Sequence, residues 1–433
     1  MNLRLLIVGC LATVVFDGSC AFGAERARPS EWRISEANGV WQLRHNGEPF
    51  YIQGAVGHVH LDLLGRCGAN AVRLPATKAN LDAAHRAGLK VMANLPVRGE
   101  RNNIDWNNKA QVKEQKQNAL DVVRQLKDHP ALMFWAVGNE LDHIPGGKQY
   151  HPQLWQRLND IAVAIKQIDR NHPTLTVVGT GNYEQKVQDI TRGCPNMDLL
   201  GINTYGDLTA VTEQTRKYWP KPYVIAEWGP TGHWQMPKTE WRAPLEQTSS
   251  QKAQVIDERY KNTILADKSH CLGSFVFYWG EKQETTHTWY GLFCGGLRTE
   301  SIDVLERIWS GKEPENRAPI LESLKIPGFD NPRAIDLKPA AKYSAEIKSH
   351  DPDSDPLQYS WDIRPEVEIP PGSYAGSMEK RAKPIEGLIV DGAGSRTEFA
   401  APASPGAYRL FVAVVDGKGH IAYANIPFRV KAD

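Results

Sequence analysis

Short apolar runs alternate with amphipathic stretches through the middle of the chain. Eight runs rich in β-branched and aromatic residues occur between residues 50 and 280, and the segments between them have helical periodicity. The runs are Phe50–Val56, Asn70–Pro75, Leu89–Val97, Ala131–Glu140, Thr174–Thr180, Met197–Tyr205, Pro222–Gly229 and Leu272–Gly280. Strands that alternate with helices predict a parallel α/β fold, and eight strands are the number that closes a (β/α)8 TIM barrel.

Both the helical and the strand patterns suit a barrel. In the segment after the fourth run, apolar residues recur every three or four positions, which gives a helix one face to pack on a sheet. These positions are Leu154, Leu158, Ile161, Ile165 and Ile168. The fourth run is apolar from Ala131 to Val137, as expected of a strand buried on both faces. A doubly wound open sheet is the competing architecture, but no GxGxxG turn follows the first run.

The composition changes after Gly311. Residues 312–319 are rich in Glu and Pro, which predicts a linker between a barrel at 32–311 and a second domain at 320–433. The second domain has short β-rich runs separated by Gly, Pro and Asp turns, so we expect a small all-β immunoglobulin-like sandwich. Before the first barrel strand, Trp32–Glu48 is expected to form a hairpin that closes the barrel bottom.

The first residues have the pattern of a secretory leader. Arg4 precedes the apolar run Leu5–Phe16, and small residues follow at Ala21, Gly23 and Ala24. We therefore expect residues 1–24 to be a signal peptide and the protein to be secreted or periplasmic. The apolar run is shorter than the ~20 residues of a transmembrane helix, so no membrane span is expected.

Charge and cysteine content limit the kinds of ligand, metal site and disulfide that the chain is expected to have. Lys and Arg number 51 and Asp and Glu number 50, which leaves no basic surplus for nucleic acid and suits a neutral carbohydrate substrate. The chain has no CxxC motif, and His58 and His60 lack further ligands at metalloenzyme spacing, so neither a metal nor a cofactor is expected. In an exported protein four cysteines beyond the leader could form disulfides, in a pairing that the sequence leaves open. They are Cys67, Cys194, Cys271 and Cys294.

Two glutamates stand at the ends of apolar strands. Glu140 ends the fourth run and Glu227 lies near the end of the seventh. Because the carboxyl ends of barrel strands form the open mouth, both side chains would point toward a bound ligand. A lone glutamate there is more often part of an ion pair, but two in one barrel favour the carboxyl pair that cleaves a glycosidic bond.

These motifs resemble clan A of the glycoside hydrolases, the 4/7 superfamily. Its members place an acid/base Glu after strand four and a nucleophile Glu at the end of strand seven, which matches Gly138-Asn139-Glu140 and Glu227-Trp228-Gly229. Within the clan, Asn70–Leu74 and Asn203-Thr204-Tyr205 are most similar to the family 2 barrel domain. The resemblance covers about residues 40–310 and implies a retaining β-glycosidase with Glu140 as acid/base and Glu227 as nucleophile.

The resemblance also implies roles for three polar residues. Asn139 would donate a hydrogen bond to the sugar 2-hydroxyl, and Arg73 would hold Glu227 ionised. Tyr205 would donate a hydrogen bond to the nucleophile. The structural alternatives are a helix cap for Asn139, a buried ion pair for Arg73 and core packing for Tyr205.

Three further residues are candidates for contact with the sugar. By the same resemblance Trp279 would form the floor of the cleaved subsite, although it could instead be a core aromatic. Trp228 and Glu281 are expected in βα loops, where ligand contacts are common.

Alternatives to hydrolysis remain open. A β-glucan transglycosylase would use both glutamates but accept a sugar hydroxyl in place of water. A catalytically silent glycan-binding barrel would be expected to lack one glutamate, and both are present.

In the second domain the turn at residues 350–355 is similar to acidic turns of cadherin-like modules, some of which bind calcium. An ordinary Asp/Pro turn is the commoner explanation.

Overall fold

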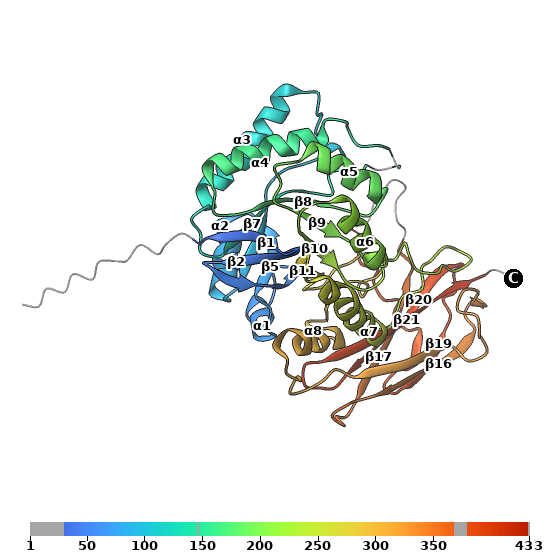
Figure 1. Ribbon diagram of the computed structural model, residues 1–433. Coiled ribbons are helices and arrows are strands. Elements are labelled where there is room, and N and C mark those ends of the chain that lie inside the picture. The colour runs from blue at the N-terminus through green and yellow to red at the C-terminus, as the bar shows by residue number, and fades with distance from the viewer. Residues whose placement is uncertain (1–29, 145, 147, 368–378, 432–433) are drawn as a thin grey trace, which may run out of the picture.

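Eight parallel strands form a closed barrel in the computed structural model, which describes residues 30–144, 146, 148–367 and 379–431 (Figure 1). Each strand pairs in parallel with its neighbours, so the predicted TIM barrel is confirmed. The barrel strands are β4 (Ile52–Val56), β5 (Ala71–Pro75), β6 (Lys90–Asn94), β7 (Leu132–Asn139), β8 (Thr174–Val178), β9 (Leu199–Asn203), β10 (Tyr223–Trp228) and β11 (Cys271–Phe277).

Helices surround the barrel and begin where the sequence supplies caps. Thr77 and Asn108 accept hydrogen bonds from backbone N–H groups of the first turns of their helices, and Thr248 forms a capping box with Gln251. The helices are α1 (Leu61–Arg66), α2 (Lys78–Arg86), α3 (Lys109–Leu126), α4 (Leu154–Ile168), α5 (Tyr183–Gly193), α6 (Leu208–Tyr218), α7 (Ser249–Arg259) and α8 (Glu300–Ser310), with short turns η1 (Glu100–Asn102), η3 (Tyr260–Ile264) and η4 (Leu265–Asp267).

A small antiparallel sheet covers the amino-terminal end of the barrel. The segment expected to be a hairpin forms β1 (Trp32–Ala37), β2 (Val40–His45) and β3 (Glu48–Phe50). Trp32 packs against Phe134 inside the barrel, and its indole N–H donates to the carbonyl of Leu132 at 2.9 Å. This closure leaves the opposite end, where the strands finish, as the open mouth.

The carboxyl-terminal region is a β-sandwich. Two four-stranded sheets, ordered β14-β16-β19-β18 and β15-β21-β20-β17, share one apolar core that includes Ile347, Phe399, Ile363 and Phe428. The strands are β14 (Ile320–Lys325), β15 (Asp336–Leu337), β16 (Lys342–His350), β17 (Gln358–Pro365), β18 (Ile389–Asp391), β19 (Arg396–Ala400), β20 (Gly406–Val415) and β21 (Ile421–Val430), preceded by the short hairpin β12 (Phe293–Cys294) and β13 (Leu297–Arg298).

The sandwich packs on the barrel through α7 and α8 (Figure 1). At the centre of this interface Lys252 on α7 forms a buried ion pair with Glu246, with Nζ and Oε1 2.5 Å apart. Glu246 also accepts hydrogen bonds from Thr286 in the loop after β11 and from Asn425 on β21. The pair therefore joins a barrel loop to the sandwich.

Replacing Lys252 with methionine is expected to lower the free energy of unfolding by about 3 kcal/mol, because the substitution leaves the Glu246 carboxylate buried without its partner. Urea unfolding followed by circular dichroism would measure the change. Lys78→Met, which removes an exposed helical pair with Asp82, is the matched control and should change stability by less than about 0.5 kcal/mol. Equal losses in both variants would contradict the role of the interface pair.

The four cysteines beyond the expected leader are buried, free thiols. The structure therefore forms none of the disulfides that export would allow, and burial raises the pKa of Cys67 and Cys194 to about 12. Residues 1–24, the expected signal peptide, lie outside the described residues. Among the described residues no helix is long and apolar enough to cross a membrane.

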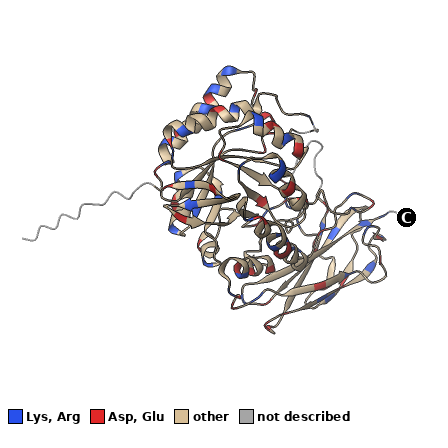
Figure 2. Ribbon diagram, viewed as in Figure 1, with Lys and Arg blue, Asp and Glu red and all other residues tan. Residues whose placement is uncertain are grey.

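Charged residues of both signs are distributed along the ribbons of both domains (Figure 2). This distribution agrees with the near-zero net charge of the chain.

Candidate active site

Glu227 lies at the mouth of the barrel, near the end of β10. Its Oε1 accepts a hydrogen bond from Arg73 Nη1 at 2.8 Å, and its Oε2 accepts one from the Tyr205 hydroxyl at 3.4 Å. Burial raises the pKa of Tyr205 well above its usual 10, so this phenol keeps its proton and remains a donor. Both contacts expected from sequence are therefore present in the geometry.

Arg73, on β5, is the centre of the site. Its side chain is almost completely buried, and its guanidinium donates to Asn139 Oδ1 at 2.6 Å and to Asn203 Oδ1 at 3.3 Å, besides Glu227. Asn94 Oδ1 accepts a further hydrogen bond from Nε at 3.2 Å. Because these donors lie in one rigid plane, Arg73 fixes side chains from β6, β7, β9 and β10 relative to one another.

Glu140 follows the irregular end of β7. The pairing of β7 with β8 shifts register between Ala136 and Asn139, and Glu140 itself has φ of 47°, which few residues other than glycine adopt. The backbone N–H of Glu140 donates to the carbonyl of Val177, and its Oε1 accepts from Asn203 Nδ2 at 2.8 Å. Such strained backbone is a common feature of functional sites.

The two glutamates are linked through shared partners. Asn203 contacts Glu140 directly and Arg73 contacts Glu227 directly, and Arg73 and Asn203 both donate to Asn139. Glu140 and Glu227 are about a quarter and a sixth exposed, respectively, so both reach the solvent of the mouth. The expected pair thus lies in one hydrogen-bonded network.

Burial raises the pKa of Glu227 to about 7, and the negative charge of Glu140 acts in the same direction, while Arg73 opposes both. Burial therefore opposes ionisation of Glu227, and Arg73 is the group that promotes the ionised form.

A prediction for pH dependence follows from this environment. Glu227 must be ionised to attack, so kcat/KM should fall as the pH drops through about 7. Arg73→Met removes the charge that favours ionisation; we expect the acid limb to move to higher pH and kcat/KM to fall about tenfold to a hundredfold. Initial rates measured across pH 4–9 would test this, with Arg124→Met on the outer face of α3 as control. An unshifted acid limb would contradict the role of Arg73.

Two of the expected sugar contacts are corrected by the structure. Trp228 is 0% exposed and stacks on Tyr260 in the helical layer. The pairing of β10 with β9 shifts register between Ile225 and Glu227, so Glu227 faces the mouth although Ala226 before it faces the barrel interior, and Trp228 faces the helices. Trp279 is also 0% exposed; it packs against Phe293, with its indole N–H 3.4 Å from the carbonyl of His60. Neither ring is open to a ligand in this conformation.

Glu281 lies apart from the carboxyl pair. It is exposed, and its Oε1 accepts a hydrogen bond from the backbone N–H of Gly296 at 2.7 Å, which orders the β12–β13 turn. The structure therefore brings together Arg73, Asn139, Glu140, Tyr205 and Glu227 but not Glu281.

Several residues of the mouth were not assigned to the site from sequence. Asn203 bridges the site, and Arg101 lies 3.8 Å from Glu140 and donates to the carbonyl of Asn139. Trp234 is 44% exposed and makes an edge contact with Tyr205, so it offers the aromatic surface that Trp228 and Trp279 do not. Asn203 ends a predicted strand, so its position in the sequence could have identified it as a site residue. The contact of Arg101 with Glu140 depends on a loop conformation that sequence patterns do not reveal.

Behind Tyr205, the loop after β11 forms a buried polar cluster. Glu284 lies 3.3 Å from His233 and 3.2 Å from Lys282. Burial acts to raise the pKa of Glu284, but His233 and Lys282 outweigh it and hold that pKa below the ordinary value. Glu284 is therefore ionised at neutral pH and places a negative charge near the mouth.

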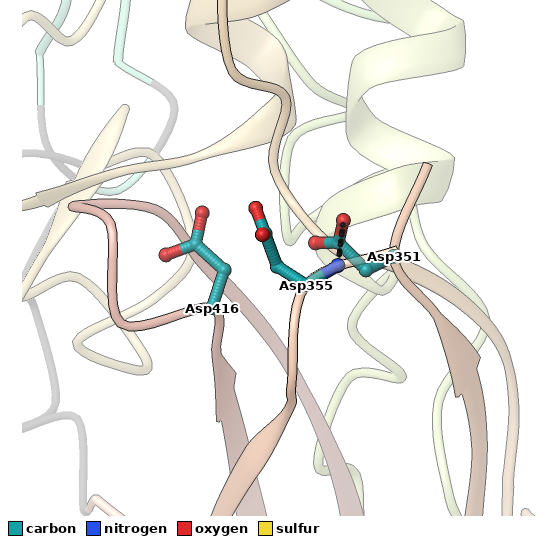
Figure 3. Close-up of side chains that lie close together, drawn as sticks. All are labelled: Asp351, Asp355 and Asp416. Atoms are coloured by element: carbon teal, nitrogen blue, oxygen red, sulfur yellow. Dashed lines mark hydrogen bonds between the residues drawn. The ribbon is translucent and has the colours of Figure 1, made fainter. Parts of the chain in front are cut away.

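The acidic turn of the sandwich brings three carboxylates together (Figure 3). Oxygens of Asp351, Asp355 and Asp416 lie within 4.8 Å of one another. Lys418 Nζ lies 2.6 Å from Asp355, and both oxygens of Asp416 accept hydrogen bonds, from the backbone N–H of Lys418 and from Asn316 among others. An ammonium group thus already balances part of this negative charge.

The barrel sequence matches the model of "Glycosyl hydrolases family 2, TIM barrel domain" over residues 43–300. This match covers more than half of the chain, so the chain belongs to glycosyl hydrolase family 2. Its parallel eight-stranded barrel has Glu140 directly after the fourth strand and Glu227 near the end of the seventh.

The chain is also similar to several β-glucuronidases. A β-glucuronidase of Chlorocebus aethiops is 27% identical over 227 residues, which cover 43% of this chain and 32% of the relative; a β-glucuronidase of Homo sapiens is 26% identical with the same coverage. The chain thus matches about a third of the length of these relatives.

Among solved structures, Bacteroides uniformis β-glucuronidase 2 bound covalently to cyclophellitol-6-carboxylate aziridine has a TM-score of 0.50 and 14% identity, covering 92% of this chain and 48% of its own. An FMN-binding β-glucuronidase from Facaelibacterium prausnitzii L2-6 has the same TM-score and identity, covering 93% of this chain and 59% of its own. At this level of identity the similarity concerns the fold.

Proposed function

We propose that the protein hydrolyses β-linked glycosides with retention of configuration, with Glu227 as nucleophile and Glu140 as acid/base. The observation that carries the proposal is the arrangement of these two carboxyl groups at the barrel mouth, joined through Arg73, Asn139 and Asn203. Membership of glycosyl hydrolase family 2 supports it.

In the first step a Glu227 oxygen attacks the anomeric carbon while the Glu140 carboxyl gives its proton to the leaving glycosidic oxygen. The bond to the leaving group breaks, and a covalent glycosyl ester forms on Glu227. In the second step Glu140, now ionised, accepts a proton from water, whose oxygen attacks the same carbon and releases Glu227. Two inversions give net retention.

Asn139 is suited to bind the sugar 2-hydroxyl. Its Oδ1 accepts hydrogen bonds from Arg73 and Asn203, which fixes the orientation of the amide and leaves Nδ2 as the group to donate. A hydrogen bond to the 2-hydroxyl strengthens as positive charge develops on the ring, so it acts mainly in the transition state.

A β-glucuronide is the first substrate to test. The named relatives are β-glucuronidases, and two cations stand at the mouth: Arg101 beside Glu140, and Lys282 above the ring of Phe277. A carboxylate on the substrate would find charge complementarity there.

The experiment is a panel of aryl β-glucuronides, β-galactosides and β-glucosides, with Glu281→Gln as control because Glu281 is exposed and outside the carboxyl pair. We expect release of the aryl group from one member of the panel by wild type and by Glu281→Gln at similar rates. A wild-type protein that binds a glycan but cleaves none would contradict hydrolysis and favour a silent binding barrel.

We also propose that the protein is exported. The support is the pattern of residues 1–24, with Arg4 before an apolar run and small residues after it. The amino-terminal sequence of protein recovered from outside the cytoplasm should begin shortly after Ala24. A mature protein that retains the whole apolar run would contradict the proposal.

The domain division that we propose is a barrel at 32–311, a connecting segment at 312–319 and a sandwich at 320–433. The connecting segment is held at several points: Arg317 pairs with Asp353, and the backbone N–H of Ala318 donates to Asp303. These contacts favour a rigid connection between the two domains over a flexible linker.

A further inference from the structure

A buried ion pair joins the loop that carries Glu140 to the loop beside it. Lys186, near the start of α5, has its Nζ 2.5 Å from Asp142 Oδ2, and both side chains are only 4% exposed. The same Nζ donates a hydrogen bond to the carbonyl of Gly179 at 2.6 Å. One ammonium group therefore connects the segment after β7 with the segment after β8.

Both segments are in contact with the candidate acid/base. Asp142 lies two residues after Glu140 in the same loop. Gly179 lies against the Glu140 carboxylate, so closely that a Cβ atom on this glycine would be 3.3 Å from Glu140 Oε1. Lys186 thus holds the loop that carries Glu140 and also the backbone against which its carboxylate packs.

The backbone conformation of Glu140 needs such support. Its φ of 47° is left-handed, and a residue other than glycine keeps this conformation only where surrounding contacts hold it. On one side, the Glu140 N–H donates to the carbonyl of Val177, and the His143 N–H donates to the carbonyl of Glu140. The ion pair between Lys186 and Asp142 adds a contact from the side of α5.

Stability alone does not account for charges at these two positions. Burial of an ammonium and a carboxylate costs desolvation free energy, and apolar side chains of similar volume often stabilise a protein at least as well. A charged pair with fixed hydrogen-bond geometry does, however, define the distance between two loops. Lys186 and Asp142 are therefore better suited to fix a position than to add stability.

We propose that Lys186 and Asp142 are positioning residues for Glu140, which hold its carboxyl group where it can give a proton to the leaving oxygen. This inference rests on the proposed function, in which Glu140 is the acid/base. If the loop is displaced, Glu227 can still attack the anomeric carbon. The loss should therefore fall on substrates whose leaving group needs a proton.

The test compares Lys186→Met with wild type on a phenyl and a dinitrophenyl glycoside of the sugar that the panel selects. The fraction of active protein is measured from the burst of dinitrophenol that a 2-fluoro analogue releases. For the phenyl glycoside, kcat/KM should fall about tenfold to a hundredfold, since a displacement of ~1 Å can cost this much. For the dinitrophenyl glycoside, which departs without a proton, kcat/KM should change by less than about twofold.

Lys252→Met is the matched control, because it removes another fully buried ion pair at a site away from Glu140. It should leave the ratio of the two kcat/KM values as in wild type. Hydrogen exchange measured by mass spectrometry supplies a second readout: residues 139–143 should exchange faster in Lys186→Met and at the wild-type rate in Lys252→Met. If wild type cleaves no glycoside, the proposed function fails, and exchange still decides whether the pair holds the loop.

A double variant covers the case in which Lys186→Met folds poorly. Lys186→Met combined with Asp142→Leu leaves no buried charge without a partner, so it should fold, but it lacks the hydrogen bond to Gly179 and should keep the altered ratio. A wild-type ratio in this variant would overturn the proposal. Equal losses with both glycosides, an equal change of the ratio in Lys252→Met, or unaltered exchange of residues 139–143 would also overturn it.

Discussion

Glu227→Ala is expected to reduce kcat by about 10⁴-fold or more, because no other carboxylate can form the glycosyl ester at that position. Initial rates with an aryl β-glycoside would measure the loss. Sodium azide should restore part of the rate, since the space left by the side chain admits a small anion that attacks the same carbon directly. The product would then be an α-glycosyl azide, with inverted configuration.

The control for this variant is Glu306→Ala, which changes an α8 carboxylate that pairs with Arg298 outside the mouth. It should retain wild-type kcat. Substantial residual activity of Glu227→Ala without azide would contradict the assignment of the nucleophile, and so would a β-configured azide product.

Glu140→Ala is expected to lower the rate about 10²- to 10⁴-fold, the usual contribution of general acid–base catalysis. The size of the loss should depend on the leaving group. With a dinitrophenyl group, which departs without a proton, the first step should remain fast and the covalent intermediate should accumulate as a burst of released phenol. With a poor leaving group the first step itself should be slow.

The configuration of the azide product distinguishes the roles of the two glutamates. In Glu140→Ala the first inversion on Glu227 still occurs, so azide attack on the intermediate should give a β-glycosyl azide, the opposite anomer from that of the Glu227 variant. A loss of equal size for good and poor leaving groups would contradict the role of Glu140.

Much of the barrel could be predicted from sequence because its determinants are local. Strand β7 is apolar at nearly every position and α4 has one apolar face, so both elements are recognisable without knowledge of their neighbours. The carboxyl pair is recognisable for a similar reason, since Glu140 and Glu227 both end apolar runs, and two such charges in one barrel favour ligand-facing positions over ion pairs.

The orientation of the tryptophans was mispredicted for an identifiable reason. Val224 and Ala226 belong to the barrel interior, so strict alternation along β10 would put Glu227 on the helical side and Trp228 inside. The pairing of β10 with β9 shifts register between Ile225 and Glu227, and this irregularity turns Glu227 to the mouth and Trp228 to the helical side. Trp279 follows the end of β11, where the strand alternation no longer applies and the chain turns its ring into the core beside Phe293. Strand alternation alone therefore places neither ring correctly.

Contacts between distant segments were beyond the reach of sequence patterns. The ion pair between Lys252 and Glu246 is completed by Asn425, which lies on the sandwich, and nothing near any of these residues in sequence indicates the others. The same applies to Asn203 and Glu140, which come from different strands. Such pairs are set by how the domains and strands pack.

The most direct test of the central claim is to identify the residue that carries the covalent intermediate. The protein would be incubated with a 2-deoxy-2-fluoro-β-glycosyl fluoride of the sugar that the panel selects, digested and analysed by mass spectrometry. We predict one added fluorosugar, carried by Glu227, and none on Glu227→Ala. A label on another residue, or turnover of that reagent with release of an α-configured product, would contradict a retaining mechanism with Glu227 as nucleophile.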